Sequence, residues 1–131
     1  MEDEKTLEFV EITLIEGWPV PTPNPSIPGM IWDKRILGDE VFRIWLGIYG
    51  GHPVSCSHAF IDHDFILVGP IATIPEMRHR GFGEALTWRA TMAKPSLPAM
   101  LHASKFGRPV YERIGYSSIA GLTLWNKDDR T

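Results

Sequence analysis

The middle third of the chain carries the clearest alternation of apolar and polar positions. From residue 42 to residue 49, apolar side chains recur at every second position, the period of a β-strand with one buried face. Gly50-Gly51 predicts a tight turn, and residues 54–61 predict a second strand. Residues 65–73 are almost all apolar, which predicts a third strand buried on both faces. Because Pro70 cannot donate to a strand ladder, we expect a bulge or a one-sided opening there.

Helical spacing begins soon after this third strand. Within residues 81–93, Ala85, Trp88 and Met92 are spaced as on one face of a helix, which Pro95 ends. Residues 99–103 then predict a short strand.

A second helix and a last strand complete the pattern. Residues 108–114 predict a helix, because Pro109 suits a helix start and Gly115 suits the position after a helix end. Residues 119–125 predict a strand. The order from residue 42 is therefore β-β-β-α-β-α-β, which predicts a single α/β (α+β) domain with a mixed, mainly antiparallel sheet.

The first 41 residues follow a different pattern. Residues 6–15 are rich in β-formers such as Phe9 and Ile12, which predicts an N-terminal strand. Five prolines within residues 19–28 exclude a helix or a central strand and predict an extended connector. Residues 32–37 are compatible with a short helix. We therefore divide the chain into residues 1–41, a strand and Pro-rich connector, and residues 42–131, the core.

Composition bounds the class of protein. The chain has 131 residues, of which 44% are hydrophobic and 22% charged, which suits one packed globular domain. No apolar run is long enough to span a membrane, and the acidic residues 1–5 lack the order of a signal peptide. Cys56 is the single cysteine, which excludes an internal disulfide. We expect a cytoplasmic protein with no membrane partner.

Charge is unevenly distributed along the chain. Residues 1–64 carry eleven acids and four bases, whereas residues 78–113 carry seven bases and two acids. The basic segment indicates an anionic ligand. Its bases form no single stripe and are not interleaved with aromatic residues, so we expect no nucleic-acid partner.

The segment between the third strand and the first helix is the most informative motif. Arg78, Gly81 and Gly83 form an R-x-x-G-x-G pattern at the helix entrance. Glycine allows close backbone approach, and the first N–H groups of a helix have no internal partners, so they favour an anion by roughly 0.3–1 kcal/mol per charge. Arg78 and Arg80 can add charge-assisted hydrogen bonds. The pattern predicts a pyrophosphate site, although a plain turn with two loop glycines would have the same sequence.

Two motifs together resemble a known family. Thr73-Ile74-Pro75-Glu76-Met77-Arg78-His79-Arg80-Gly81-Phe82-Gly83 resembles the V-x-P-x-x-R-x-x-G-x-G segment of the GNAT superfamily of acetyl-CoA-dependent N-acetyltransferases. Leu101-His102-Ala103-Ser104, followed by Gly107 and Tyr111-Glu112-Arg113-Ile114-Gly115-Tyr116, resembles its L-x-A-S…Y-x-x-x-G-[FY] segment. The resemblance covers about residues 42–125 and is weak or absent over residues 1–41.

The resemblance implies a GNAT-like domain that binds acetyl-CoA as co-substrate. In this family the third strand and the strand after the first helix splay apart, and pantetheine pairs with the former strand, here at Ile71, Thr73 and Ile74. Arg78 stands at the family's phosphate-facing position. The pyrophosphate would be held by the backbone amides of the helix entrance: His79, Arg80, Gly81, Phe82, Gly83 and Glu84.

Two further residues receive roles from the resemblance. Tyr111 matches the tyrosine that protonates the leaving CoA thiolate, a step that suits a phenol of pKa roughly 10. The alternative is a half-buried structural tyrosine. Ser104 stands where many relatives have an asparagine that bonds the pantetheine arm, and it could equally cap the following helix.

Other functional assignments remain open at this stage. Glu76, Asp64, His63 and His58 are candidates for the general base, and none matches a family motif. The histidines lack metal-ligand spacing, so we expect no metal. Cys56 is most simply a small buried apolar residue.

The leading hypothesis is an acyltransferase that moves the acetyl group from acetyl-CoA to a primary amine by direct attack in a ternary complex. Two alternatives are a CoA-binding module that acts as sensor or partner subunit, and a binder of other anions or nucleic acid. Relatives usually build the acceptor side from an N-terminal strand and two helices, and this chain looks reduced there. A reduced domain would leave apolar surface uncovered, so we expect a homodimer.

Overall fold

The computed structural model of the chain describes residues 4–17, 32–123, 125 and 127. Within them it has a four-stranded sheet of order β1-β2-β3-β4, in which β1–β2 and β2–β3 are antiparallel and β3–β4 is parallel. This is the mixed, mainly antiparallel sheet that the sequence predicts. The elements are α1 (Glu4–Gly17), the 3₁₀ turn η1 (Lys34–Ile36), β1 (Phe42–Tyr49), β2 (His52–Ile61), β3 (Ile66–Thr73), the 3₁₀ turn η2 (Pro75–Met77), α2 (Phe82–Thr91), β4 (Ala99–Leu101) and α3 (Arg108–Arg113).

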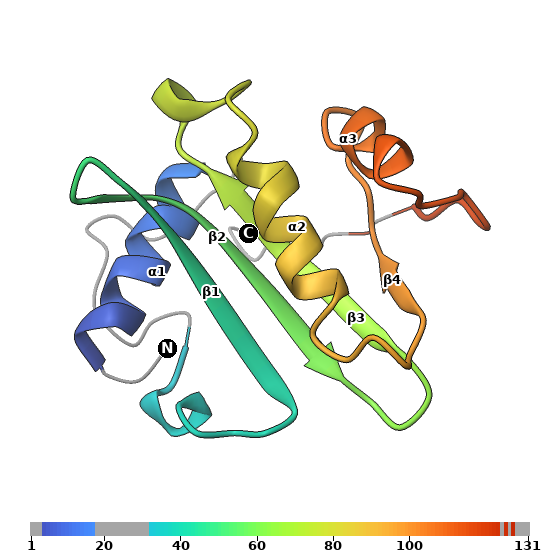
Figure 1. The fold of residues 1–131 in the computed structure, drawn as a ribbon, viewed down its shortest axis with the longest axis horizontal. Coiled ribbons are helices and arrows are strands. Elements are labelled where there is room, and N and C mark those ends of the chain that lie inside the picture. The colour runs from blue at the N-terminus through green and yellow to red at the C-terminus, as the bar shows by residue number, and fades with distance from the viewer. Residues whose placement is uncertain (1–3, 18–31, 124, 126, 128–131) are drawn as a thin grey trace.

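The sheet lies between two helical layers. α1 covers one face, and α2 crosses the other face beside α3 (Figure 1). Buried residues of α1 pack on the sheet as one apolar cluster: Leu7, Val10, Leu14, Ile44, Cys56 and Ala72. A second cluster lies under α2: Ala59, Ile66, Val68 and Ala90. These two clusters fix the positions of β3 and α2, which carry the predicted site.

The predicted N-terminal strand over residues 6–15 is wrong, because this segment is helix α1. Its β-branched and aromatic residues favour a strand by propensity alone. However, Leu7, Val10 and Leu14 are buried at intervals of three and four, which is the period of a helix that packs one face on a sheet. Tertiary packing of this apolar face outweighs the weaker local preference.

The predicted last strand, residues 119–125, is also wrong over the described part of that segment, which has no regular secondary structure. Ile119, Leu122 and Trp125 are largely exposed. A strand needs a partner edge to satisfy its backbone, and no described segment pairs with this one. The expected helix near residues 32–37 is the single turn η1. The expected connector over residues 19–28 lies outside the described residues.

The expected bulge and one-sided opening at Pro70 are both confirmed. The β2–β3 register shifts between Ser57 and Ala59, opposite Gly69 and Pro70. β3 pairs with β4 only from Ile66 to Val68, so its remaining residues have no neighbour on that side. The two parallel strands therefore splay apart at the bulge.

Gly17 joins the end of α1 to the end of β3. A Cβ atom placed on Gly17 would lie 2.9 Å from the backbone carbon and oxygen of Thr73. We expect Gly17→Ala to lower the free energy of unfolding by about 2 kcal/mol, since backbone cannot yield as a side chain can. Urea unfolding measures this, with Gly121→Ala as control because nothing lies within 4 Å of that position. Equal stability of the two variants would show that the contact is not tight.

Candidate active site

Beyond Val68, β3 has no paired strand among the described residues on its β4 side. The backbone groups on that side face the region where β3 and β4 diverge, which we call the splay. In an antiparallel pair, alternate residues turn their N–H and C=O groups toward the partner strand and away from it. The Ile74 N–H donates to the Val54 carbonyl at 2.9 Å, and this fixes which residues face β2. Ala72 therefore faces β2, whereas Ile71 and Thr73 turn their backbone groups toward the splay. These two residues offer an edge that an extended ligand can pair with.

Ile74, the third predicted strand position, does not offer this edge. Its N–H is engaged with Val54, and its carbonyl accepts the Met77 N–H at 3.0 Å within the turn η2. Neither group faces a ligand. The prediction for Ile74 is therefore corrected, and the expected pairing reduces to Ile71 and Thr73.

The entrance of α2 presents unpaired amides near the same end of β3. Gly81, the residue before the helix, has φ +88° and gives no side-chain cap, and His79 has φ +64°. A Cβ on Gly83 would lie 3.5 Å from Thr73 Oγ1, so the helix entrance adjoins the end of β3. Among the described residues no acceptor is recorded for six consecutive N–H groups: His79, Arg80, Gly81, Phe82, Gly83 and Glu84. Such a run of donors at a helix N-terminus suits a phosphate.

Arg78 has a role that the motif did not indicate. Its guanidinium donates from Nη2 to the Gly17 carbonyl at 2.9 Å and from Nε to the Thr73 carbonyl at 3.2 Å. It thus satisfies a carbonyl at the C-terminus of α1, where cations are favoured, and ties that helix to the end of β3. Its other N–H groups are still able to donate to a phosphate, and that contact stays a prediction.

Arg80 and Phe82 pack beside the β1–β2 turn. The Arg80 guanidinium lies over the Tyr49 ring at 5.3 Å and donates to Met77 Sδ at 3.4 Å. The Phe82 ring meets Tyr49 edge-on at 5.6 Å. The exposed Arg80 has no carboxylate partner among the described residues, so its charge is available at the helix entrance.

Glu84 contributes an ion pair as well as an amide. Arg113, in the last turn of α3, donates to both Glu84 carboxylate oxygens at 3.3 and 3.2 Å. Both groups are substantially exposed, so the pair contributes at most about 1 kcal/mol. Its geometric effect is to hold α3 beside the first turn of α2.

Ser104 caps the turn that leads into α3. Its Oγ accepts the Gly107 N–H at 3.1 Å, and its carbonyl accepts the Arg108 N–H at 3.0 Å. Of the two roles left open for Ser104, the structure therefore contains the cap. Its hydroxyl proton is still free to donate, so the pantetheine bond stays a prediction.

Tyr111 projects from α3 with a hydroxyl that has no recorded hydrogen bond among the described residues. Its ring packs closely on Gly107, where a Cβ would lie 2.7 Å from a ring carbon. Burial, and secondarily the neighbouring Tyr116, raise the pKa of Tyr111. The phenol therefore keeps its proton at neutral pH, the state that a general acid requires. Tyr116 differs, since its hydroxyl lies 2.6 Å from Thr91 Oγ1 and is already bonded.

The structure narrows the candidates for a general base. Asp64 and His63 belong to the β2–β3 turn, at the opposite end of β3 from Thr73. His58 is fully buried, and burial lowers its pKa to about 4. Glu76 in η2 remains exposed near the splayed end of β3. Cys56 is also buried, with its pKa raised to about 12, which fits the apolar role expected for it.

The buried His58 makes stability depend on pH. Its pKa is depressed from 6.5 to about 4 in the folded chain, so the unfolded chain binds more protons between these values. The free energy of unfolding is therefore expected to fall by about 3 kcal/mol as pH drops from 6.5 to 4. Urea titrations of the protein and of His58→Gln measure this. A His58→Gln variant that loses as much stability over this interval would assign the effect to other groups.

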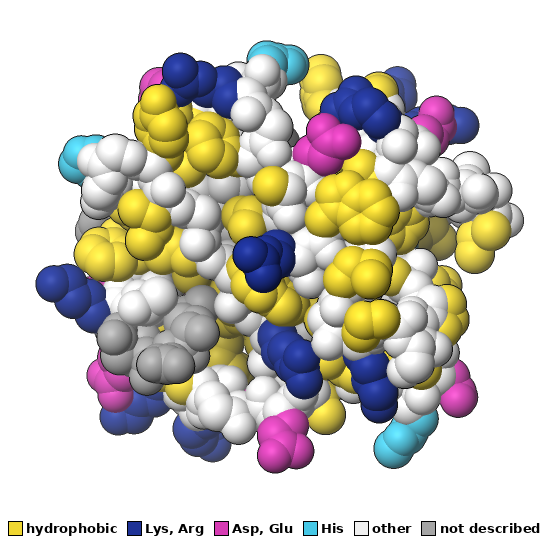
Figure 2. Space-filling view, viewed as in Figure 1, with side chains coloured by type: hydrophobic (Ala, Val, Ile, Leu, Met, Phe, Trp, Pro, Cys, Tyr) yellow, Lys and Arg dark blue, Asp and Glu magenta, His cyan; other side chains and the backbone are white. Residues whose placement is uncertain are grey.

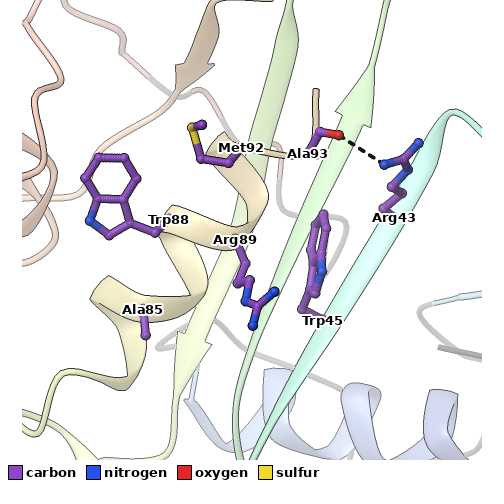
Figure 3. Close-up of a pocket in the computed structure, with 7 residues that line it drawn as sticks. All are labelled: Arg43, Trp45, Ala85, Trp88, Arg89, Met92 and Ala93. Atoms are coloured by element: carbon purple, nitrogen blue, oxygen red, sulfur yellow. Dashed lines mark hydrogen bonds between the residues drawn. The ribbon is translucent and has the colours of Figure 1, made fainter. Parts of the chain in front are cut away.

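A groove between α2 and β1 is not part of this site. It has a volume of about 420 Å³ and lies between α2 and β1, on the far side of α2 from the splay (Figure 3). Trp45 and Arg89 face each other across it, and Arg43 donates to the Ala93 carbonyl at 3.1 Å. Arg43 thus caps the C-terminus of α2. Lys and Arg side chains are spread over this face of the molecule and do not form one stripe (Figure 2).

Neither a metal site nor a membrane-spanning helix is found among the described residues. No group of three His, Cys, Asp or Glu side chains in the described ranges could hold a metal ion. None of the described helices is both long and apolar enough to cross a bilayer.

Comparison with solved structures shows which known proteins share this fold. No protein-family model matches the chain, and no curated protein matches it. Solved structures do match. The chain superposes on aminoglycoside N-acetyltransferase AAC(6')-Iy, in complex with the bisubstrate analogue CoA-S-monomethyl-acetylneamine, with a TM-score of 0.74 and 17% identity, covering 95% of this chain and 93% of that one.

Two further structures give the same result. A protein from Agrobacterium tumefaciens described as an acetyltransferase matches with a TM-score of 0.75 and 16% identity, covering 95% of this chain and 96% of that one. A protein from Clostridium acetobutylicum described as an acetyltransferase, solved with acetyl-CoA, matches with a TM-score of 0.70 and 20% identity, covering 95% and 92%. The chain has the GNAT acetyltransferase fold, as its motifs predicted. The coverage extends into the first 41 residues, where the sequence resemblance was weak or absent.

Proposed function

We propose that the chain is an acetyl-CoA-dependent N-acetyltransferase, an acyltransferase that moves an acetyl group to a primary amine by direct attack. One observation carries the proposal: the backbone edge of Ile71 and Thr73 that β4 leaves uncovered adjoins six amides at the entrance of α2 for which the described residues supply no acceptor. An edge that pairs with an extended amide chain beside a phosphate cradle fits the pantetheine and pyrophosphate of one CoA molecule. The match to structures solved with CoA ligands supports the same reading.

The proposed chemistry follows from the groups at this site. A neutral amine attacks the thioester carbonyl carbon, so that a C–N bond forms and the C–S bond breaks. Tyr111 donates its proton to the departing thiolate, the amine nitrogen gives up one proton to water, and Tyr111 regains a proton from water. The Thr73 N–H faces the splay and is the proposed donor to the carbonyl oxyanion. Ile74 is excluded from that role because its N–H already bonds Val54. Alignment of amine and thioester supplies much of the rate, up to roughly 7–11 kcal/mol of the barrier.

The test combines ligand binding with turnover. In a thermal-shift titration, CoA and acetyl-CoA are expected to raise the melting temperature, whereas ATP at equal concentration is not. A panel of primary amines then assays acetyl transfer. Equal stabilisation by ATP would favour a general anion site, and CoA binding without transfer to any amine would favour a CoA-binding module. Either result would contradict the proposed enzyme.

The acceptor and the assembly state belong to the same proposal. The acceptor is a primary amine, and nothing in the described site selects one kind of amine.

A homodimer is proposed because Ile119, Leu122 and Trp125 expose apolar surface after α3. The first reason for expecting a dimer, apolar surface left uncovered by a reduced N-terminal part, is weaker, since α1 covers one face of the sheet. A cytoplasmic location is proposed from the single, buried cysteine.

A further inference from the structure

The bulge in β3 decides which residues face the splay. Before the bulge, Ile66 turns its backbone toward β4, because its N–H donates to the Pro98 carbonyl at 2.9 Å. If every second residue of β3 kept this orientation, the backbone groups of Val68, Pro70 and Ala72 would also face the β4 side. Because Pro70 has no N–H, a strand without the bulge would lack one hydrogen-bond donor along the edge that faces the splay. The extra residue shifts the alternation by one.

After that shift, Ile71 and Thr73 face the splay, each with a backbone N–H, and the Thr73 carbonyl also accepts a hydrogen bond from Arg78 Nε. The register change from Ala59↔Val68 to Ser57↔Ile71 marks the same shift on β2. The edge proposed to pair with pantetheine therefore exists only while the bulge is in place.

The bulge places the Pro70 carbonyl beside the His58 side chain. Two residues before Ala72, Pro70 also turns its carbonyl toward β2. His58 is the β2 residue within this irregularity, and its Nδ1 lies 2.6 Å from the Pro70 oxygen. A carbonyl only accepts, so Nδ1 carries the proton and the side chain adds a hydrogen bond across the bulge.

The surroundings of His58 favour this tautomer. The side chain is fully buried, and its Nε2 has no partner. The Trp32 indole packs against it with ring centroids 5.3 Å apart, and Trp32 Nε1 is also buried and unpartnered. In the Nδ1–H tautomer, His58 Nε2 is an acceptor beside an indole donor, so the two unpartnered groups are complementary. The neutral ring agrees with the lowered pKa of His58.

We propose that His58 is a positioning residue for acetyl-CoA: by holding the Pro70 carbonyl it fixes the bulge that turns the Ile71 and Thr73 backbone toward the splay. The inference rests on the proposed function, and it gives His58 no contact with substrate or reacting atoms. Loss of the Nδ1 donor would remove this hydrogen bond across the bulge and let the strand change register, which acts on CoA binding first.

The test compares three variants by calorimetry with CoA and by steady-state kinetics. His58→Leu removes the donor and is expected to raise the Kd of CoA and the KM of acetyl-CoA by about tenfold. His58→Gln keeps a donor and is expected to stay within about twofold of the natural protein. Ile44→Ala is the matched control, since Ile44 lies opposite His58 on β1 and belongs to the buried cluster under α1, away from the bulge in β3. It lowers stability without touching the bulge, so its Kd for CoA is expected to be unchanged.

Three outcomes would overturn the inference: His58→Leu binds CoA like the natural protein, His58→Gln binds as weakly as His58→Leu, or Ile44→Ala weakens binding equally.

NMR of the free protein gives a separate readout that needs no ligand. The imidazole nitrogen shifts are expected to show the Nδ1–H tautomer, and His58→Leu is expected to move the Ile71 and Thr73 amide signals. An Nε2–H ring or unmoved amides would overturn the inference. Absence of any CoA binding by the natural protein would contradict the proposed function instead.

Discussion

Tyr111→Phe is expected to lower kcat by about 10²-fold or more while the Kd of acetyl-CoA changes less than about threefold, because only the proton transfer to the thiolate is lost. The phenol has no recorded hydrogen bond among the described residues, and its raised pKa keeps it protonated. Removal of the oxygen therefore leaves little in the fold unsatisfied. Steady-state kinetics with acetyl-CoA and an active amine measure kcat, and calorimetry measures the Kd.

Tyr116→Phe is the matched control for this experiment. Tyr116 lies beside Tyr111, with ring centroids 6.2 Å apart, and it too is partly buried with a raised pKa. Its hydroxyl bonds Thr91, so its loss is expected to lower stability by about 1 kcal/mol and to leave kcat nearly unchanged. If Tyr116→Phe lowered kcat as much as Tyr111→Phe, the acid role could not be assigned to Tyr111.

Gly83→Val is expected to raise the Kd of CoA at least about tenfold with little loss of stability. Valine is no worse than glycine in a helix, so α2 itself should not suffer. The added side chain points to the end of β3, where the Cβ alone reaches within 3.5 Å of Thr73 Oγ1. Its methyl groups would occupy space between the free amides and the strand edge, where the phosphate and pantetheine are proposed to lie. Isothermal calorimetry with CoA measures the change.

Gly121→Val controls for the addition of the same side chain elsewhere. No atom lies within 4 Å of a Cβ at that position, so both stability and CoA binding are expected to match the natural protein. Undiminished CoA affinity in Gly83→Val would remove the helix entrance from the binding site.

Local sequence predicted the elements whose period or chemistry is unambiguous. The strand over residues 42–49 has the predicted bounds, because apolar side chains at every second position all lie on one face of a strand. The opening at Pro70 was predictable because proline cannot complete a ladder bond. The entrance of α2 was predictable because glycines at residues 81 and 83 follow a buried strand and precede a helical pattern.

Features that depend on distant partners were not predictable in the same way. α1 was misassigned because Phe9 and Ile12 favour strands locally, whereas burial against the sheet selects the helix. Arg78 reaches the Gly17 carbonyl, 61 residues away, and no local motif encodes that contact. Ile74 was placed in the site by motif alone, but the hairpin register decides which way its N–H points.

Some signals were present in the sequence and could have been used. Leu7, Val10 and Leu14 have helical spacing, which a test of period would have set against β-propensity. A histidine in the strand beside Pro70 is a further signal, because a buried imidazole N–H needs an acceptor such as a strand carbonyl. The role of His58 was missed because the pairing register had to be known first.

The most direct test of the central claim is an NMR titration of the isotope-labelled protein with CoA, in which each backbone amide reports on its own surroundings. The account predicts that the largest shifts fall on the amides of residues 79–84 and of Ile71 and Thr73, with little change at Arg43 and Arg89 in the groove on the other side of α2. Shifts concentrated in that groove, or no shifts at saturating CoA, would contradict it.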